Sequence, residues 1–286
     1  MEAKLKVEDE VIFPDELILE AGRSEKNYWL DLWRYRELFY FLAWRDILVR
    51  YKQTVIGIAW AVVRPLLTTV VFTMVFSRIA KLSAPNAVPY ALLVMSAMLP
   101  WQFFSTSMSE ASNSLIGNSN LISKVYFPRM VVPAGAVITS LVDFLITLGL
   151  VSLMMAWYHY APDWRLFLLP AFTVLAFGAS FGIGLWLCAL NVEYRDFRYI
   201  VPFIVQFGLY VSPVGFSSSL VPEKWRLIYS LNPMVGVIDG FRWCLLRGES
   251  PVNPSFLFAS VFVTAALCAS GIAYFRKMER TFADII

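Results

Sequence analysis

The chain has 286 residues, of which 58% are hydrophobic and 16% are charged, and its formal net charge is +3. Soluble proteins carry about 25% charged residues, and the apolar residues here fall in long blocks. The composition therefore excludes an ordinary soluble domain and predicts an all-α polytopic membrane protein. Residues 1–27 are acidic and hold no apolar block, so we expect a cytoplasmic N-terminal tail without a secretory signal.

The next segment, residues 28–46, reads YWLDLWRYRELFYFLAWRD. At 100° per residue, one half of a helix collects the charged side chains Asp31, Arg34, Glu37, Arg45 and Asp46. The remaining surface is rich in tryptophan, phenylalanine and leucine. This pattern predicts an amphipathic interface helix over residues 28–52 that lies in the membrane surface. Two compatible roles stay open: a lipid anchor, or a charged face that docks a cytoplasmic partner.

Six apolar blocks are candidates for membrane spans within a single domain, residues 53–286. They cover roughly 55–77, 89–116, 130–158, 166–191, 199–216 and 254–275. Lysine and arginine are more frequent in the segments on the N-terminal side of the membrane, which predicts that both termini are cytoplasmic.

A seventh apolar piece, roughly 231–247, is interrupted by Pro233, Asp239 and Arg242. It predicts a short re-entrant helix before the last span rather than a full crossing. Asn232 suits the cap of this helix, and Pro233 suits its first position. Such a helix in the outer leaflet would fit a gate.

Three charged residues fall inside the predicted spans: Arg64, Glu110 and Asp143. Charges at that depth are functional hypotheses by default. Arg64 and Glu110 have similar depth, so an ion pair between them is conceivable, whereas Asp143 has no obvious partner. The alternative for each is an interhelical hydrogen bond or a subunit contact.

The loop between the second and third spans begins NSNLISKVYFP. Asn118 or Ser119 can cap a short helical turn, and Pro128 ends it. A short helix at the end of long spans suits a lever that contacts a soluble motor. An ordinary connector is the alternative.

Chemistry-bearing motifs are few. The chain has no G-x-x-x-x-G-K-[ST] phosphate loop, so it is not expected to bind or hydrolyse a nucleotide in that way. Its single histidine, His159, lies among aromatic residues typical of a membrane interface. No metal cluster and no Ser-His-Asp arrangement is visible, so we expect no catalytic residue, metal or cofactor on this chain.

Aromatic residues recur at helical spacing in two of the spans. Phe203, Phe207 and Tyr210 are spaced i, i+4, i+7, and Phe72 and Phe76 are spaced i, i+4. These rings either line a path on which sugars stack or face lipid; the sequence leaves both open.

Three runs together resemble the permeases of polysaccharide ABC exporters. The run RDILVRYKQTVIGIAWAVVRPLLTTVVFTMVF, residues 45–76, is similar to the first-span signature of that family. The runs NSNLISKVYFPRMVVP, residues 118–133, and NPMVGVIDGFRWCLLRG, residues 232–248, resemble its coupling loop and its outer Asn-Pro motif. The matching residues of the first run are Arg50, Tyr51, Lys52, Gly57, Trp60 and Pro65.

The resemblance implies a homodimer that binds two copies of a separate ATPase, which would hold ATP and Mg²⁺. It implies a lipid-linked polysaccharide as substrate, with O antigen as the first choice before capsule or teichoic acid, exported across the bacterial inner membrane. The residues that would couple ATP hydrolysis to export are Asn118, Ser119, Asn120, Leu121, Ile122, Ser123, Lys124 and Tyr126, with Arg34 and Arg45 on the interface helix.

The same reasoning assigns two further sets of residues. The predicted substrate path comprises Arg50, Tyr51, Lys52, Trp60, Arg64, Phe72, Phe76, Phe203, Phe207 and Tyr210. The predicted outer gate comprises Asn232, Pro233, Asp239 and Arg242.

Two other classes of protein were weighed. A transferase acting on a polyprenyl phosphate would need clustered carboxylates or histidines on the inner side, where the loops offer only Glu193 and Asp196. A secondary transporter would be expected to show repeat symmetry with broken helices in both halves, and only one broken region is visible.

Overall fold

The computed structural model describes residues 28–52, 57–84, 88–125, 127–250 and 252–282. These residues form helices joined by turns and loops and contain no strand, which confirms the predicted all-α class. The predicted N-terminal tail, residues 1–27, and Tyr126 of the predicted coupling loop lie outside the described residues.

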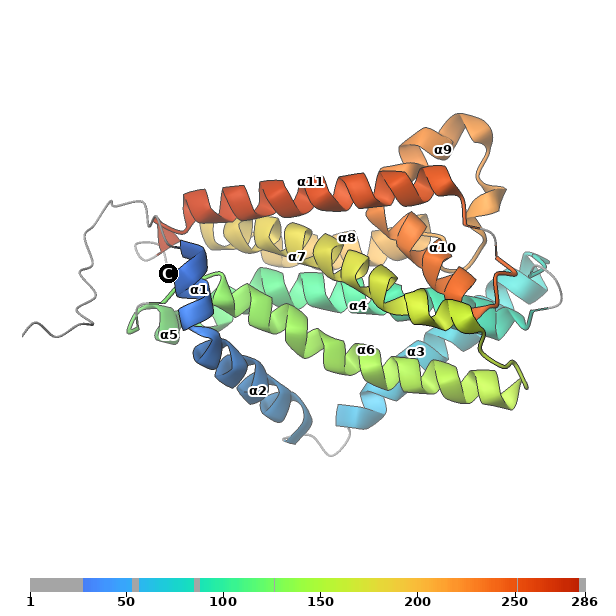
Figure 1. Cartoon of the computed structure of the whole chain (residues 1–286), viewed down its shortest axis with the longest axis horizontal. Helices are drawn as coiled ribbons and strands as arrows, with labels where there is room; N and C mark the ends of the chain where they lie inside the picture. Colours follow the sequence, from blue (N-terminus) through green and yellow to red (C-terminus); the bar gives the residue numbers. More distant parts are fainter. Residues whose placement is uncertain (1–27, 53–56, 85–87, 126, 251, 283–286) are drawn as a thin grey trace, which may run out of the picture.

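The long helices build the body of the molecule (Figure 1). They are α3 (Gly57–Phe72), which continues as the π-helix η1 (Thr73–Ile79), then α4 (Tyr90–Gly117), α6 (Val131–Trp157), α7 (Leu169–Glu193), α8 (Phe197–Val211) and α11 (Pro254–Met278). The short elements are α1 (Tyr28–Arg34), α2 (Arg36–Lys52), α5 (Ser119–Ile122), η3 (Trp164–Leu168), η4 (Ser218–Leu220), α9 (Glu223–Ser230) and α10 (Pro233–Leu245).

Apart from α2, which has 17 residues and packs on α6, the short elements gather at the two ends of the bundle. In Figure 1, α1 and α5 lie beside the C-terminal end of α11, and we call this the α5 end. Helices α9 and α10 lie at the opposite end of the long helices, which we call the α10 end. The bundle therefore separates the predicted coupling elements from the predicted gate by the length of the long helices.

Four helices of the described chain are long and apolar enough to cross a membrane: Ala59–Ile79, Val131–Trp157, Trp164–Glu193 and Pro254–Met278. Helix α8 is apolar but has only 15 residues. Helix α4, the predicted second span, has 28 residues but is less apolar because it carries many serines. The predicted count of six spans stays a prediction.

Helix α4 occupies the centre of the molecule and contacts α3, α6, α7, α8 and α10. Its hydroxyl groups bond to its own backbone: Ser96 Oγ donates to the Leu93 carbonyl at 2.9 Å, and Ser114 Oγ to the Ala111 carbonyl at 2.7 Å. A buried hydroxyl satisfied in this way carries little desolvation penalty. The central helix can therefore be polar because other helices of the chain, rather than lipid, surround much of it.

Helices α7 and α11 cross at a contact between two glycines. A Cβ atom on Gly182 would lie 2.6 Å from the backbone nitrogen of Cys268, and a Cβ atom on Gly271 would collide with the backbone of Gly182. Small residues allow close approach of two backbones, which supplies dispersion contacts where lipid gives no hydrophobic drive. The two glycines thus set the spacing between α7 and α11.

The predicted interface helix is two helices. Helix α1 ends at Arg34, and α2 begins at Arg36 after a turn at Tyr35. Leu42 and Ala43 of α2 are buried and α2 packs on α6, so the apolar side of this helix is covered partly by protein. The prediction of one continuous helix over residues 28–52 is therefore wrong. Packing against α6 sets the direction of the second part, α2.

Candidate functional site

A cluster of four polar side chains joins the end of α2 to the long helices. Arg50 Nη1 lies 2.7 Å from Asp143 Oδ2 on α6, and Arg50 Nη2 pairs with Glu110 Oε1 on α4. The hydroxyl of Tyr51 donates to Asp143 Oδ1. We call Arg50, Tyr51, Glu110 and Asp143 the polar clamp. It ties α2 to two helices at once.

The donors and acceptors of the clamp match one another chemically. Burial, followed by the hydrogen bond to Asp143, raises the pKa of the Tyr51 hydroxyl, so Tyr51 stays a protonated donor at neutral pH. The Arg50 guanidinium offers its donors in a planar fork that suits two carboxylates. Carboxylates at membrane depth are costly without a partner, and the clamp supplies one for each.

The conceivable pair between Arg64 and Glu110 is replaced by the pair between Arg50 and Glu110. Asp143, for which the sequence offered no partner, has two. The reason is the path of α2, which packs against α6 and brings its last residues to both carboxylates. Helical spacing within α2 cannot show which helix it packs against.

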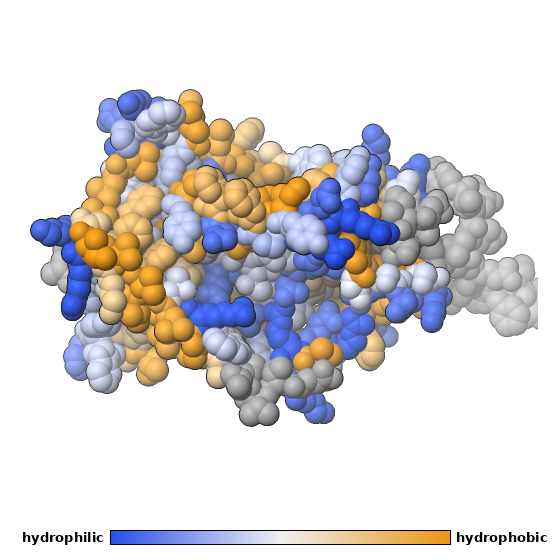
Figure 2. All heavy atoms as spheres, turned by 180° about the vertical axis from the view of Figure 1, so that it is seen from behind, coloured by the Kyte–Doolittle hydropathy of each residue, from blue (hydrophilic) through white to orange (hydrophobic). Residues whose placement is uncertain are grey.

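A groove of about 580 Å³ opens between α3, α4 and α8. Its polar lining comprises Arg64, Thr68, Gln102, Ser105, Thr106, Ser109, Glu110 and Gln206. Figure 2 shows the face of α3 and α8, where hydrophilic residues gather over a hollow with apolar residues on either side. Glu110 belongs to both the groove and the clamp, so the clamp forms part of the groove wall.

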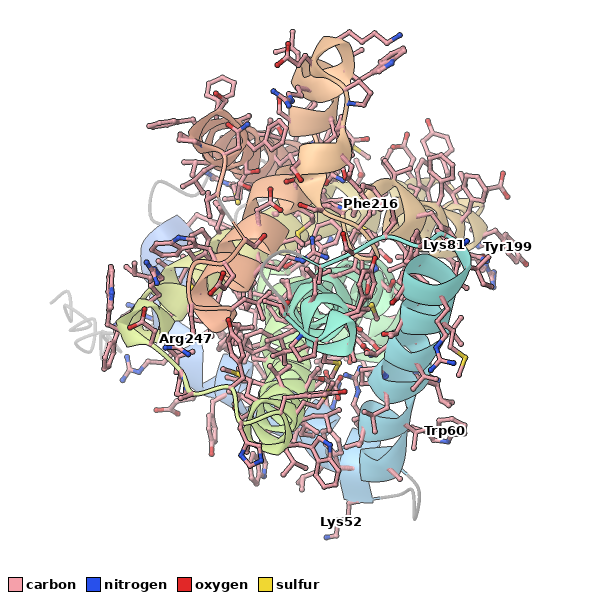
Figure 3. The ribbon with its side chains drawn as sticks, turned by 90° about the vertical axis from the view of Figure 1, so that its right-hand side faces the viewer. Lys52, Trp60, Lys81, Tyr199, Phe216 and Arg247 are labelled. Atoms are coloured by element: carbon pink, nitrogen blue, oxygen red, sulfur yellow. The ribbon has the colours of Figure 1, made fainter. Side chains whose placement is uncertain are left out.

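Arg64 lies at this groove rather than in a helix contact. Its guanidinium carbon is 5.9 Å from the centre of the Trp60 ring, within cation–π range. Trp60 itself points outward from α3 and away from the bundle (Figure 3). Arg64 makes no ion pair with another described residue. The Arg64 guanidinium is therefore available to bind an anionic group at the groove.

The predicted aromatic path divides into two parts. Phe72 is buried, and its ring packs against Phe76 and Tyr210 with centroids 5.5 and 6.3 Å apart. These three rings connect α3 to α8. Phe203 and Phe207 are exposed on α8 and stack with centroids 6.0 Å apart. Phe72, Phe76 and Tyr210 thus form a packed contact, whereas Phe203 and Phe207 form an open surface. Lys52, another residue of the predicted path, is exposed at the end of α2.

The predicted coupling loop contacts α2 directly. Arg45 Nη2 donates to Asn118 Oδ1 at 2.7 Å, and Asn118 Nδ2 donates to the Ser114 carbonyl at 2.9 Å. The Asn118 side chain therefore does not cap α5, and the backbone carbonyl of Asn118 accepts instead from Leu121 and Ile122. Asn118 occupies the cap position of α5, as predicted, but its side chain makes no capping hydrogen bond because its amide bonds to Arg45 and Ser114.

The remaining residues of α5 and its flanks differ in exposure. Ile122 is buried, Ser119 and Leu121 are half-buried, and the side chains of Asn120, Ser123 and Lys124 are exposed. Arg34 is exposed at the end of α1. The exposed residues form a surface at the α5 end, and Ile122 anchors it to the body.

Sequence reasoning missed a contact between this loop and the end of the chain. The Arg129 backbone N–H donates to Glu279 Oε1, and Arg129 Nη1 donates to the Glu279 carbonyl, both at 2.7 Å. Arg276 lies 4.6 Å from the centre of the buried Tyr28 ring. Burial, with the nearby Glu279 carboxylate, raises the Tyr28 pKa. No periodic pattern links these distant residues, so the sequence held no signal for them.

At the α10 end, the predicted helix start is confirmed. Asn232 Oδ1 accepts from the Met234 N–H at 3.0 Å, and Pro233 occupies the first turn. Asn232 Nδ2 also donates to Ser212 Oγ at 2.9 Å, across 20 residues. The cap therefore fixes α10 to the segment that follows α8.

The two charged residues of α10 each bond outside their helix. Arg242 is fully buried and donates to the carbonyls of Phe216 at 2.7 Å, Val214 at 2.9 Å and Leu93 at 3.3 Å. The carboxylate of Asp239 accepts from Ser218 Oγ at 2.5 Å. These bonds tie α10 to α4 and to the loop after α8. A gate formed by α10 would therefore have to move together with these segments.

The described residues offer no group of three or more histidine, cysteine or acidic side chains that could hold a metal ion. What they offer is a polar groove with one available cation, a clamp in its wall and a connected set of short helices at the α5 end. This arrangement suits movement of a polar solute and transmission of force.

Comparisons with known proteins show which proteins this chain resembles. The O-antigen export system permease protein RfbA of Klebsiella pneumoniae is 27% identical over 246 residues, covering 85% of this chain and 92% of that protein. RfbA of Myxococcus xanthus is 28% identical over 259 residues, covering 90% and 98%.

A third relative is a capsule exporter subunit. The capsule polysaccharide export inner-membrane protein CtrC of Neisseria meningitidis serogroup A is 28% identical over 246 residues, covering 82% of this chain and 90% of that protein. The model of the ABC-2 type transporter family matches residues 37–246, which include the clamp, the groove, α5 and α10. This chain is therefore a multi-pass membrane protein that belongs to the ABC-2 type transporter family.

Proposed function

We propose that this chain is the membrane subunit of an ATP-driven exporter of lipid-linked polysaccharide, with O antigen as its substrate. The observation that carries the proposal is the groove between α3, α4 and α8. Its hydroxyl and amide side chains suit sugar hydroxyls, and Arg64 suits a phosphate. The choice of O antigen rests on the RfbA relatives, and capsule polysaccharide is the substrate named by the CtrC relative.

The working unit is a homodimer with two copies of a separate ATPase that holds ATP and Mg²⁺. Support comes from the chain itself, which has no phosphate loop. Support also comes from the groove, which opens on one side of the molecule and would need a second copy to become an enclosed path. The exposed surface of α5 is the docking point for the ATPase.

The complex lies in the bacterial inner membrane with six spans per chain, formed by α3, α4, α6, α7, α8 and α11. The α5 end then faces the cytoplasm together with both termini, and α10 forms a re-entrant helix on the outer side. The distribution of lysine and arginine supports this orientation.

Force would pass from the ATPase to the groove through α2. Movement of α5 reaches α2 through the bond between Arg45 and Asn118. Movement of α2 reaches α4 and α6 through the clamp, in which Arg50 holds Glu110 and Asp143. Because Glu110 is part of the groove wall, the part of α2 from Arg45 to Arg50 connects the motor surface to the path.

The test is reconstitution of the purified complex. Co-expression with a candidate ATPase is expected to yield a complex of two copies of each chain, measured by native mass spectrometry. In vesicles, ATP is expected to drive O antigen into the lumen faster than capsule polysaccharide. Isolation of the chain as an active transporter without an ATPase would overturn the proposal, and faster capsule transport would reassign the substrate.

A further inference from the structure

We infer that a cavity at the α5 end of the molecule binds the phosphoryl headgroup of a lipid. The cavity has a volume of about 320 Å³, and its polar lining comprises Asn113, Ser119, Asn191, Arg195 and Arg198. It is separate from the groove that contains Arg64, because the two share no lining residue. The inference rests on the proposed function, since it concerns how the substrate of that exporter is first bound.

The floor of the cavity is held rigid by amide hydrogen bonds. Asn191 is fully buried, and its Nδ2 donates to the Ser112 carbonyl at 2.9 Å and to Asn113 Oδ1 at 3.1 Å. Asn113 Nδ2 donates in turn to the Ser109 carbonyl at 2.9 Å. The Oδ1 atom of Asn191 is buried without a hydrogen-bond partner. This oxygen is an acceptor, so it calls for a donor such as an ordered water rather than a phosphoryl oxygen.

The charged part of the lining is two arginines. Neither Arg195 nor Arg198 makes an ion pair with any described residue, and Arg198 lies 5.6 Å from the centre of the Tyr199 ring. The acidic residues of the same loop, Glu193 and Asp196, do not line the cavity. Each arginine side chain offers paired N–H donors, and such pairs suit the oxygens of a phosphoryl group.

The surroundings of the cavity favour a lipid over a soluble phosphate. Tyr199 is exposed beside Arg198 and points outward (Figure 3), and exposed tyrosines are typical of headgroup depth. From there, Ile200, Phe203 and Phe207 continue along α8 as exposed apolar side chains. An amphiphile with its phosphoryl group at the arginines could lay its chain on this apolar face.

The cavity and the groove are lined by residues of the same two helices, α4 and α8, a few turns apart. On α4, Asn113 follows the groove residue Glu110 by about one turn, and on α8, Arg198 precedes the groove residue Val205 by about two turns. With a rise of about 1.5 Å per residue, the offset along α8 is roughly 10 Å. A headgroup bound at Arg198 would therefore lie one short step from the groove and Arg64.

An acidic surface of the ATPase is the other chemistry that two arginines could bind. Ser119 of α5 lines the cavity, so that partner would be near. The exposed apolar face on α8 is better explained by a headgroup that carries a hydrophobic chain. The ATPase contact is kept as an outcome of the test.

The test measures binding of geranylgeranyl diphosphate to the full chain in nanodiscs of a neutral lipid. Competition arms use geranylgeraniol, inorganic diphosphate and phosphatidylglycerol. The variant is R195Q/R198Q, and R195K/R198K keeps the charge without the planar fork. The matched control is K224Q/R226Q, two cations at the α10 end. Native co-purification with the ATPase and thermal melting are measured for every variant.

We expect geranylgeranyl diphosphate to bind the wild-type chain, R195Q/R198Q to bind at least tenfold more weakly, R195K/R198K to lie between them, and the control to match the wild type. Competition by phosphatidylglycerol at equal strength would support the phosphoryl site and assign it to membrane phospholipid. Weak competition by phosphatidylglycerol would assign it to an isoprenoid carrier.

Unchanged binding in R195Q/R198Q with unchanged melting would overturn the inference. Loss of the ATPase with diphosphate binding retained would overturn it as well and would make the cavity a docking site for that partner. If the wild-type chain fails to prefer the diphosphate over the alcohol while the wild-type complex still exports polysaccharide, the cavity assignment fails and the proposed function stands. Failure of export by the wild-type complex would count against the proposed function alone.

Discussion

The guanidinium of Arg50 lies 2.7 Å from the carboxylate of Asp143, a residue 93 positions away in the sequence. The same guanidinium pairs with Glu110. One residue near the end of α2 therefore forms ion pairs with two carboxylates on two different helices. Because Arg45 of the same helix bonds to Asn118 at the start of α5, α2 contacts both the clamp helices and the coupling loop.

Replacement of Arg50 is expected to destabilise the chain more than a nearby exposed change. Arg50, Glu110 and Asp143 are 26%, 48% and 22% exposed, so the clamp lies between a surface pair and a buried one. Arg50→Gln leaves two carboxylates unpaired and should cost about 1–3 kcal/mol. A drop of roughly 5 °C in the midpoint is expected, measured by scanning fluorimetry.

The matched control is Lys52→Gln, two residues further along α2 with an exposed side chain. Its midpoint should stay close to that of the wild type. The triple variant R50Q/E110Q/D143N should recover much of the loss, because no charge is then left without a partner. Equal midpoints for R50Q and K52Q would show that the clamp does not stabilise the fold.

The bond between Arg45 and Asn118 is expected to transmit force rather than to hold the fold. Arg45→Gln and Asn118→Ala each break the 2.7 Å hydrogen bond. Each should lower polysaccharide export at least tenfold in vesicles while ATP hydrolysis continues, and the double variant should lose little more than either single one. The control is Lys277→Gln, an exposed residue in the last turn of α11 at the same end and outside the coupling loop. Additive losses in the double variant would mean that the two residues act separately.

Arg242 is expected to be among the most sensitive positions for folding. It is fully buried and serves three carbonyl groups on two other segments. Arg242→Met leaves those carbonyls without a donor and should cost about 3–5 kcal/mol. Arg242→Lys keeps the charge but not the fork, and should be intermediate.

The measurement is the yield of monodisperse protein and its melting midpoint. Arg226→Gln at the same end is the control. It removes a partly exposed arginine whose ion pair with Glu223 has a distance of 3.3 Å, and it should change the melting midpoint little. A stable R242M variant would show that the carbonyls find other donors.

A methyl group between α7 and α11 is expected to separate these helices. Gly182→Ala would place a Cβ atom 2.6 Å from the Cys268 backbone nitrogen, so one backbone has to move. Gly149→Ala is the control, because nothing lies within 4 Å of its Cβ position. Melting should show a loss for G182A and, for G149A, no loss or a gain of about 0.4–1 kcal/mol. Equal midpoints would contradict the close crossing.

The exposed rings on α8 are expected to act in export. Alanine at Phe203 and Phe207 should slow export several-fold, because the lipid-linked substrate loses the ring faces along which it lies. Phe258 and Phe262 on α11 have the same i, i+4 spacing and similar exposure, which makes F258A/F262A the matched control. Export rates in vesicles decide the question. Equal rates in both variants would assign the α8 rings to lipid contact.

Local features were predictable from the sequence because local forces set them. Asn232 and Pro233 predicted the start of α10, and the helix begins there with the asparagine as its cap. Asn118 also suits a cap, yet its amide is taken by Arg45 and Ser114. The difference is tertiary: a side chain caps its own helix only when no partner from another element competes for it.

The sequence alone determined the helical class, the apolar blocks, the lack of a phosphate loop and the resemblance that the family match confirmed. These follow from composition, from helical periodicity and from short motifs, all of which act within a few residues. Only the tertiary structure decided that Arg50 rather than Arg64 pairs with Glu110, and that Asp143 has a partner. Such pairings depend on how helices far apart in sequence pack together, and no local pattern carries that information.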